Sequence, residues 1–318
     1  MCYSAMVEQE LEKLARMVAT EVDFSAIEQL FASRLEDDSI KVARAFESNF
    51  DRPESGVEER IKDLIDRYRA KVRGSLQSSL FKLKKRLADA ERTLAVRQTR
   101  KALEDKRIAT WKIEWTLGKL ADLGRTEPLE ADSRIFPFWY APVVIVRDGR
   151  RVLRPMRYHC RPNGKPASYD HQYDGLYNAR RDNLEGFWRN VFGRHHAILV
   201  AKSFYENVAL HDFERRELRE GEKARNVILH FNPRSSTPML VACLWDLWRA
   251  PGQPDLYSFA AITDEPPVEV AETGHDRCII PLEPRAIDAW LTPTPDRKAL
   301  DALLDERERP YYEHRLAA

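Results

Sequence analysis

The segment that decides the fold is FPFWYAPVVIVRDGRRVLRPMRY, residues 136–158. Two runs rich in β-branched and aromatic residues flank Asp148-Gly149, a dipeptide that favours the tight turn of a β-hairpin. Short apolar runs of similar composition follow at 195–206, 226–232, 238–248 and 256–263, each bounded by turn residues. The sequence therefore predicts an α+β protein built around an antiparallel, barrel-like β core with flanking helices.

The regions on either side of this core have helical patterns. Within residues 5–50, apolar residues at helical spacing predict two helices, over 8–19 and 24–35, and Asp23 is placed to cap the second. The chain from Asp288 onward also predicts helix, most clearly over 295–308.

Residues 57–123 form a long, almost proline-free helical stretch, which we interpret as an insertion within a single domain covering residues 1–318. Between Val57 and Lys112 there are 17 Lys and Arg against 8 Asp and Glu, a local net charge of +9. One interpretation is a helical hairpin or coiled-coil-like element with solvated charges. Its apolar stripe would be Leu64, Ile65, Tyr68, Leu76, Leu80 and Leu83. The alternative is an arm that binds DNA phosphates or a partner protein.

The overall composition excludes several classes of protein. The 52 basic and 51 acidic residues among 318 nearly cancel, so any affinity for nucleic acid must come from local clusters. The four cysteines lack the spacing of a zinc site, and we expect no metal and no cofactor. Without a signal peptide or an apolar run of membrane-spanning length, the sequence predicts a cytoplasmic protein with free thiols and no membrane partner.

Cys2 is the first candidate for chemistry. Removal of Met1 would leave a free amine, with a reference pKa near 8, and a thiol, near 8.5, on the same residue. The amine can form an imine with an aldehyde, and the thiol can then close a five-membered thiazolidine ring. An internal cysteine cannot react in this way because it has no free amine.

Three further segments give Cys2 a context: LYNARRDNLE (176–185), AKSFYENV (201–208) and ETGHDRCIIPL (272–282). Together with Met1-Cys2 they resemble, in order, the motifs of the SOS response-associated peptidase (SRAP) family, the abasic site processing proteins. The resemblance covers Met1 to about Leu291, apart from the helical region near 57–123.

The resemblance implies a role for each matching residue. Cys2 would be the nucleophile, Asn178 would position it, Glu206 would act as general acid or base, and His275 would be the second proton-transfer group. Arg180 would hold a backbone phosphate. These residue types suit the chemistry, because imine formation needs proton transfer and the guanidinium fork matches phosphate oxygens.

The implied function is covalent capture of abasic sites in single-stranded DNA as part of DNA repair and the SOS response, with strand cleavage by a lyase reaction as a side activity. The alternative is a cysteine-dependent peptidase with Cys2 as N-terminal nucleophile. A third class is a noncatalytic protein whose helical insertion recruits a protein partner.

A second set of residues is predicted to contact DNA. Arg154, Arg157, Tyr158 and Arg161 lie where family members often carry a Trp-Gly stretch that lines the DNA groove. Tyr158 could stack on a base and the arginines could bind phosphates. The alternative is a basic β-hairpin without a ligand. We expect His195-His196 to be structural, and Cys160, Cys243 and Cys278 to be buried, inert thiols.

Overall fold

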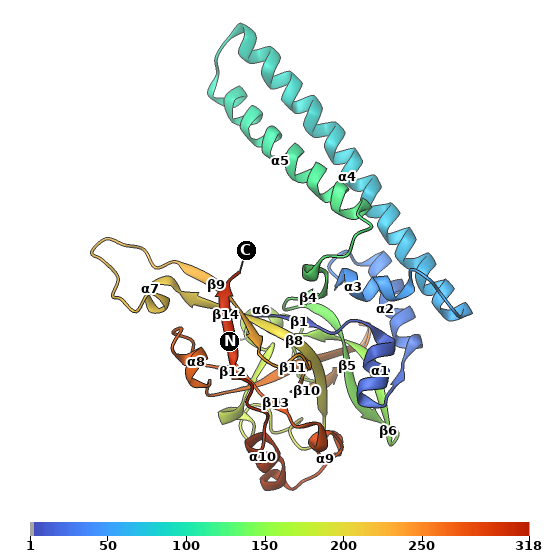
Figure 1. The fold of residues 1–318 in the computed structure, drawn as a ribbon. Helices are drawn as coiled ribbons and strands as arrows, with labels where there is room; N and C mark the ends of the chain where they lie inside the picture. The colour runs from blue at the N-terminus through green and yellow to red at the C-terminus, as the bar shows by residue number, and fades with distance from the viewer. Residues whose placement is uncertain (1–2, 318) are drawn as a thin grey trace.

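The computed structural model describes residues 3–317, and its core is a closed five-stranded barrel (Figure 1). The barrel strands are β5 (Trp139–Arg147), β6 (Arg150–Tyr158), β8 (His196–Ala209), β10 (Met239–Trp248) and β11 (Leu256–Asp264). They pair in the order β10–β11–β6–β5–β8, and β8 pairs back with β10. The predicted α+β barrel is confirmed.

One feature of the barrel differs from the prediction. Four of its five strand pairs are antiparallel, but β6 and β11 run parallel, with Ser258 opposite Arg157 and Phe259 opposite Tyr158. The barrel is therefore mixed, and its one parallel contact joins two strands that are far apart in the sequence. The β5–β6 hairpin turns at Asp148 and Gly149, whose φ angles of 51° and 75° suit an Asp-Gly dipeptide.

Beyond the barrel, β8 continues and pairs with further strands outside the ring. Its C-terminal half lies between β1 (Ser4–Val7) and β9 (Asn226–Pro233), with Ser4 opposite Tyr205 and Leu229 opposite Glu206. β4 (Arg134–Ile135) pairs with β1, and β14 (Tyr312–Leu316) pairs with β9. The strands β1 and β14 were not predicted, because β1 is four residues long and β14 is largely exposed and charged.

The remaining short elements connect these strands. The strands are β2 (Glu21–Val22), β3 (Lys41–Val42), β7 (Asn178–Arg180), β12 (Cys278–Ile279) and β13 (Pro281–Leu282). The helices are α3 (Arg44–Glu47), α6 (Tyr169–Gln172), α7 (Leu210–Phe213), α8 (Val268–Ala271), α9 (Ile287–Leu291) and α10 (Arg297–Asp305). Helices α9 and α10 confirm the helical C-terminal region up to Asp305.

The two predicted N-terminal helices are present. Helix α1 (Leu11–Val18) buries Leu11, Leu14 and Val18 on one face, as its periodicity indicates. Helix α2 (Phe24–Glu36) begins after Asp23, whose carboxylate accepts a hydrogen bond from the Ala26 amide at 2.9 Å.

The hairpin arm, defined here as residues 56–124, consists of α4 (Gly56–Val96) and α5 (Arg100–Gly124) packed against each other. It projects away from the barrel (Figure 1). Its apolar stripe is only partly covered: Ile65 and Tyr68 are buried near the base, whereas Leu76 and Leu80 farther out are half-buried.

Across residues 3–317, no helix is both long and apolar enough to cross a membrane.

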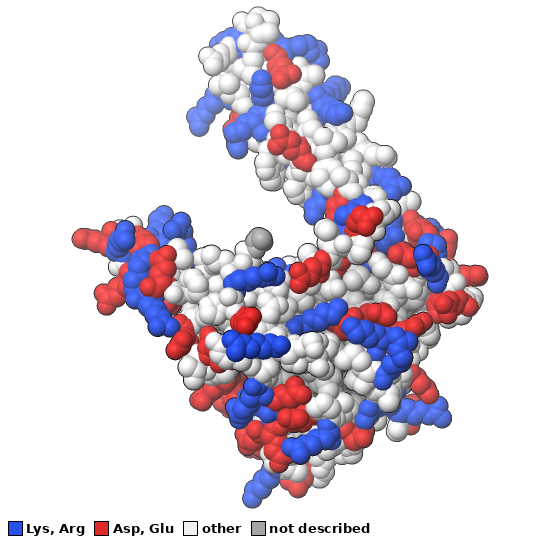
Figure 2. Space-filling view, viewed as in Figure 1, with Lys and Arg blue, Asp and Glu red and all other residues white. Residues whose placement is uncertain are grey.

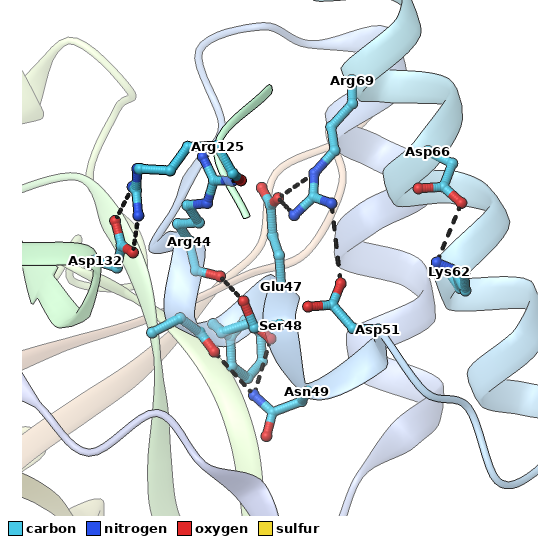
Figure 3. Close-up of polar contacts among 12 residues, drawn as sticks. Arg44, Glu47, Ser48, Asn49, Asp51, Lys62, Asp66, Arg69, Arg125 and Asp132 are labelled. Atoms are coloured by element: carbon cyan, nitrogen blue, oxygen red, sulfur yellow. Dashed lines mark hydrogen bonds and ion pairs between the residues drawn. The ribbon is translucent and has the colours of Figure 1, made fainter. Parts of the chain in front are cut away.

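The base of the arm is fixed to the body by ion pairs (Figure 3). Buried Glu47 on α3 accepts hydrogen bonds from Arg34 of α2 at 2.5 Å and from Arg69 of α4 at 3.0 Å. Arg34 also lies over the Tyr68 ring, 4.1 Å from its centroid. A single carboxylate therefore joins the arm to two helices of the body.

We expect Glu47→Ala to lower the free energy of unfolding by about 3–5 kcal/mol, because it leaves a buried arginine without its counter-charge. Chemical denaturation would measure this loss. The matched control is Glu28→Ala, which removes the exposed Glu28–Arg60 pair at the same base and should change stability far less. Equal losses in both variants would contradict the role given to Glu47.

Candidate functional site

A buried acid–base pair lies where β8 leaves the barrel. The Glu206 side chain is on the same face of β8 as Phe204 and Val208, and Glu206 is fully buried. Its Oε2 lies 3.0 Å from Nε2 of His275, which is 8% exposed. The other ring nitrogen of His275, Nδ1, lies 2.9 Å from the Arg277 carbonyl oxygen and 3.2 Å from the Arg277 amide nitrogen. The imidazole is therefore held in place from both sides.

Asn178 lies at the start of β7, which pairs with the C-terminal end of β11. Strand β7 pairs with β11 where β6 ends, with Asn178 opposite Ala261, and β12 pairs with Thr263 and Asp264. Asn178 is 5% exposed, and within residues 3–317 neither its side-chain oxygen nor its nitrogen has a hydrogen-bond partner. A buried amide without partners is costly unless a ligand or another polar group satisfies it.

The N-terminal strand leads towards this pair. Tyr3 donates its backbone N–H to the Tyr205 carbonyl at 3.2 Å, so the described chain begins beside β8 one residue from Glu206. Cys2, the predicted nucleophile, lies outside the described residues. The Tyr3 ring is 36% exposed and meets Phe136 edge-on, with ring centroids 5.9 Å apart.

Gly274 sets the position of His275. Its φ of +89° favours glycine, and a Cβ added there would lie 2.6 Å from Asp212 Cβ and 3.4 Å from Val208 Cγ1. The turn before His275 thus packs directly on α7 and on β8 two residues beyond Glu206.

Gly274→Ala is therefore expected to destabilise the protein by about 1–3 kcal/mol and to move His275 away from Glu206. Gly252→Ala is the matched control, because Gly252 also has a positive φ, +72°, but its added Cβ would meet no atom within 4 Å. Thermal or chemical unfolding of the two variants would compare them. The packing argument fails if both lose the same stability.

A basic cluster borders the acid–base pair. Arg180, at the end of β7, is exposed and pairs with Asp182 at 2.8 Å. Arg277, two residues after His275, pairs with the same Asp182 oxygen at 3.1 Å. One carboxylate is thus shared by two guanidinium groups, and Arg277 Nε also lies 3.9 Å from the carboxylate of Asp276. The prediction singled out Arg180 but not Arg277, although both lie in the quoted segments.

Arg134 is a second basic group that sequence reasoning missed. Its Nε and Nη2 atoms donate to Ser4 Oγ at 3.0 and 2.8 Å, and its guanidinium carbon lies 3.5 Å from the centroid of the Tyr205 ring. Burial lowers the pKa of Arg134, and nearby Tyr205 opposes that effect. Among the described residues no carboxylate pairs with Arg134. This half-buried positive charge lies beside the N-terminal strand and is suited to an anion.

The DNA contacts predicted for residues 154–161 need correction. Tyr158 is 2% exposed and stacks on Phe259, so its ring cannot stack on a base. Arg157 and Arg161 both bind the buried carboxylate of Asp170, at 2.8 and 2.5 Å. Burial raises the pKa of Asp170, but hydrogen bonds from the two arginines outweigh it and lower the pKa overall. Arg154 binds Asp23, the cap of α2, at 2.7 Å. These side chains stabilise the fold.

The other sequence-predicted groups lie in the core. Cys160, Cys243 and Cys278 are fully buried or nearly so, and burial raises the pKa of each thiol, as expected of inert cysteines. His196 packs between Phe192 and Trp290, and burial lowers its pKa to about 4. His195 stacks on Trp245. Within residues 3–317, no group of three or more His, Cys, Asp or Glu side chains is placed to hold a metal ion.

A closed barrel with a buried carboxylate–imidazole pair beside its N-terminal strand defines a β-barrel protein with an acid–base site. The family model for SOS response associated peptidase (SRAP) matches residues 94–316, and the chain belongs to that family. The match begins in the last turn of α4.

Comparison with curated proteins gives no match. Three crystal structures resemble part of the chain, and each similarity covers 58% of the present chain. One, from Bacteroides thetaiotaomicron, is 14% identical, is itself covered over 77% of its length and has a TM-score of 0.46. A protein from Bordetella bronchiseptica is 19% identical, is covered over 87% and has a TM-score of 0.45. A phage-related protein from the same organism is 18% identical, is covered over 80% and has a TM-score of 0.43.

Proposed function

We propose that the protein captures abasic sites in single-stranded DNA covalently, through the amine and thiol of Cys2 after removal of Met1. The observation that carries this proposal is the buried Glu206–His275 pair, 3.0 Å apart, beside the strand that begins two residues after Cys2. A carboxylate and an imidazole in contact can exchange protons with a reacting group. Membership of the SRAP family supports a role in the response to DNA damage.

The chemistry balances as a condensation. The Cys2 amine attacks C1′ of the ring-opened sugar aldehyde, and the carbinolamine loses one water to give an imine. The thiol sulfur then bonds to the imine carbon, and the thiol proton ends on the ring nitrogen. Glu206 and His275 would carry the protons that the carbinolamine gains and loses. The side-chain amide of Asn178, which has no hydrogen-bond partner among residues 3–317, would bind Cys2 or the sugar hydroxyl.

The basic groups around the pair are suited to the DNA backbone. Arg180 and Arg277 lie on the His275 side, and Arg134 lies on the side of the N-terminal strand. We assign their guanidinium groups to phosphates on either side of the lesion, since each guanidinium offers paired N–H donors. Tyr3 and Phe136 form an aromatic surface next to Arg134 that suits an unstacked base.

The direct test is the mass of the product. Protein incubated with an abasic single strand should give a species that equals the protein without Met1 plus the DNA minus one water. A strand with a tetrahydrofuran in place of the abasic sugar has no aldehyde and should give none. If the abasic strand gives no adduct under conditions in which the protein is folded, the proposal fails. Shortened strands in the same reaction would reveal the accompanying lyase activity.

The family name itself favours a second candidate, a cysteine-dependent peptidase that acts on its own N-terminus. While Met1 is attached, the Cys2 nitrogen is an amide, so Glu206 or His275 would have to act as the base that activates the thiol. Mass spectrometry of the N-terminal peptide distinguishes the two. Retention of Met1 only in Glu206→Gln or His275→Ala would indicate self-cleavage, whereas loss of Met1 in every variant would indicate processing by another enzyme.

A further inference from the structure

The charge of the protein is divided between the hairpin arm and the body. Residues 71–119 contain 14 Lys and Arg against five Asp and Glu, a net charge of +9, although the whole chain carries only +1. The rest of the chain is therefore at −8. Figure 2 shows this division on one face: Lys and Arg predominate on the arm, whereas both signs are interspersed on the body.

Four of the five acidic residues within 71–119 are already paired with basic residues of the same stretch. Asp89, Glu91, Glu104 and Asp105 bind Arg92, Lys106, Arg107 and Arg86 at 2.5–3.4 Å. These pairs leave a surplus of lysines that form no ion pair with any residue in the described part of the chain, among them Lys82, Lys85 and Lys101. A simple solvated face would mix both signs, so the surplus indicates an acidic partner.

Those three lysines surround a hollow near the tip of the arm. It lies between α4 and α5, has a volume of about 570 Å³, and is lined by Lys82 and Lys85 from α4 and by Lys101 from α5. The Arg86–Asp105 ion pair also lines it, together with Thr93 and Thr99. All three lysines are exposed, so their ammonium groups are accessible from outside.

The start of α5 adds to the positive character of this hollow. Thr99 caps the helix and lines the hollow, and the first turn contains Arg100 and Lys101 but no acidic residue. Helix N-termini favour negative side chains, as at the start of α4 with Glu58 and Glu59. Two cations at the positive end of α5 are unfavourable unless an anion lies nearby.

The base of the arm is held to the body by ion pairs and is linked through the chain to the N-terminal strand. Besides the Glu47 pairs, Arg125, directly after α5, binds Asp132 at 2.6 Å (Figure 3). Two residues after Asp132 comes Arg134, which binds Ser4 of the N-terminal strand. The stretch of α4 from Lys71 to Val96 extends about 39 Å, close to one turn of B-form DNA.

We infer that the hairpin arm binds the phosphate backbone of nucleic acid, with Lys82, Lys85 and Lys101 as its contacts around the α4–α5 hollow. A nucleic-acid duplex carries about one negative charge per 1.7 Å, which matches a long surface of unpaired lysines better than the sparser charge of an acidic protein segment. This binding is separate from covalent capture and needs neither Cys2 nor a lesion.

Binding of a fluorescent, lesion-free duplex to the full-length protein, measured by anisotropy between 50 and 200 mM salt, tests the inference. The variant Lys82→Gln/Lys85→Gln/Lys101→Gln should bind about tenfold or more weakly at 50 mM, and its slope of log affinity against log salt should be shallower by about 2–3. The matched control, Arg249→Gln/Arg285→Gln/Lys298→Gln, removes three exposed charges from the body. It should keep the wild-type slope.

Three results would overturn the inference. The first is an arm variant that binds like the body control, and the second is a wild-type protein with no salt-dependent binding of duplex. The third is poly-glutamate that binds in place of DNA and depends on the same lysines, which would assign the hollow to an acidic protein. Replacing the three lysines with arginine should preserve binding. Capture of a short abasic strand should be unchanged in the arm variant, which separates this test from that of the proposed function.

Discussion

Replacing Cys2 with alanine is expected to abolish the covalent adduct with abasic DNA, because alanine retains the amine but has no thiol to close the ring. An open imine hydrolyses readily, so no heat-stable band should remain on a denaturing gel. Cys2→Ser should behave alike, and borohydride, which reduces imines, should trap both variants on the DNA.

The control for this change is Cys243→Ala. Cys243 lies fully buried in β10, and burial raises the pKa of its thiol, so it cannot replace Cys2 as nucleophile. Its removal should leave the adduct intact. A heat-stable adduct with Cys2→Ala at the wild-type yield would refute the thiazolidine, and the N-terminal mass of each variant must show that Met1 is absent.

Glu206→Gln should slow adduct formation by about 10²–10⁴-fold. Glutamine keeps the size of the side chain and can still accept a hydrogen bond from His275, but it cannot take up a proton. Since Glu206 is fully buried and 3.0 Å from His275 Nε2, water cannot easily replace its function. Single-turnover time courses with excess protein would measure the rate.

Glu272→Gln provides the comparison for that experiment. Glu272 pairs with Arg215 in an exposed ion pair, and its loss should leave the rate unchanged. Unfolding temperatures of both variants separate a chemical effect from a loss of fold. A Glu206→Gln protein that is folded and reacts within threefold of wild type would remove Glu206 from the mechanism.

The core strands could be predicted because their signals are local. The alternating residues of β5 and β6 and the Asp148-Gly149 turn lie within one short segment. The parallel contact between β6 and β11 could not be predicted in this way, because it joins residues about 100 positions apart and has no turn to mark it. Strand β1 was missed because its four residues precede a strong helical pattern.

In the candidate site, too, some residues could be predicted from the sequence and others could not. The acid–base residues Glu206 and His275 came from a resemblance between motifs, and the structure places them in contact; their roles remain predictions. The basic run at 154–161 was misleading because Asp170 and Asp23 lie outside it and neutralise its arginines. Arg134 has no sequence signal, since its importance comes from Ser4, 130 residues earlier in the chain.

The pairing of β1 has a consequence for biosynthesis. Its main partner, β8, begins at His196, so roughly 190 residues must be made after Ser4 before the two strands can meet. At typical rates of synthesis this takes about 10–40 s. During that interval the residues of β1 have no strand to pair with. The pairing of β1, and with it the position of Tyr3 beside β8, therefore waits for the synthesis of β8.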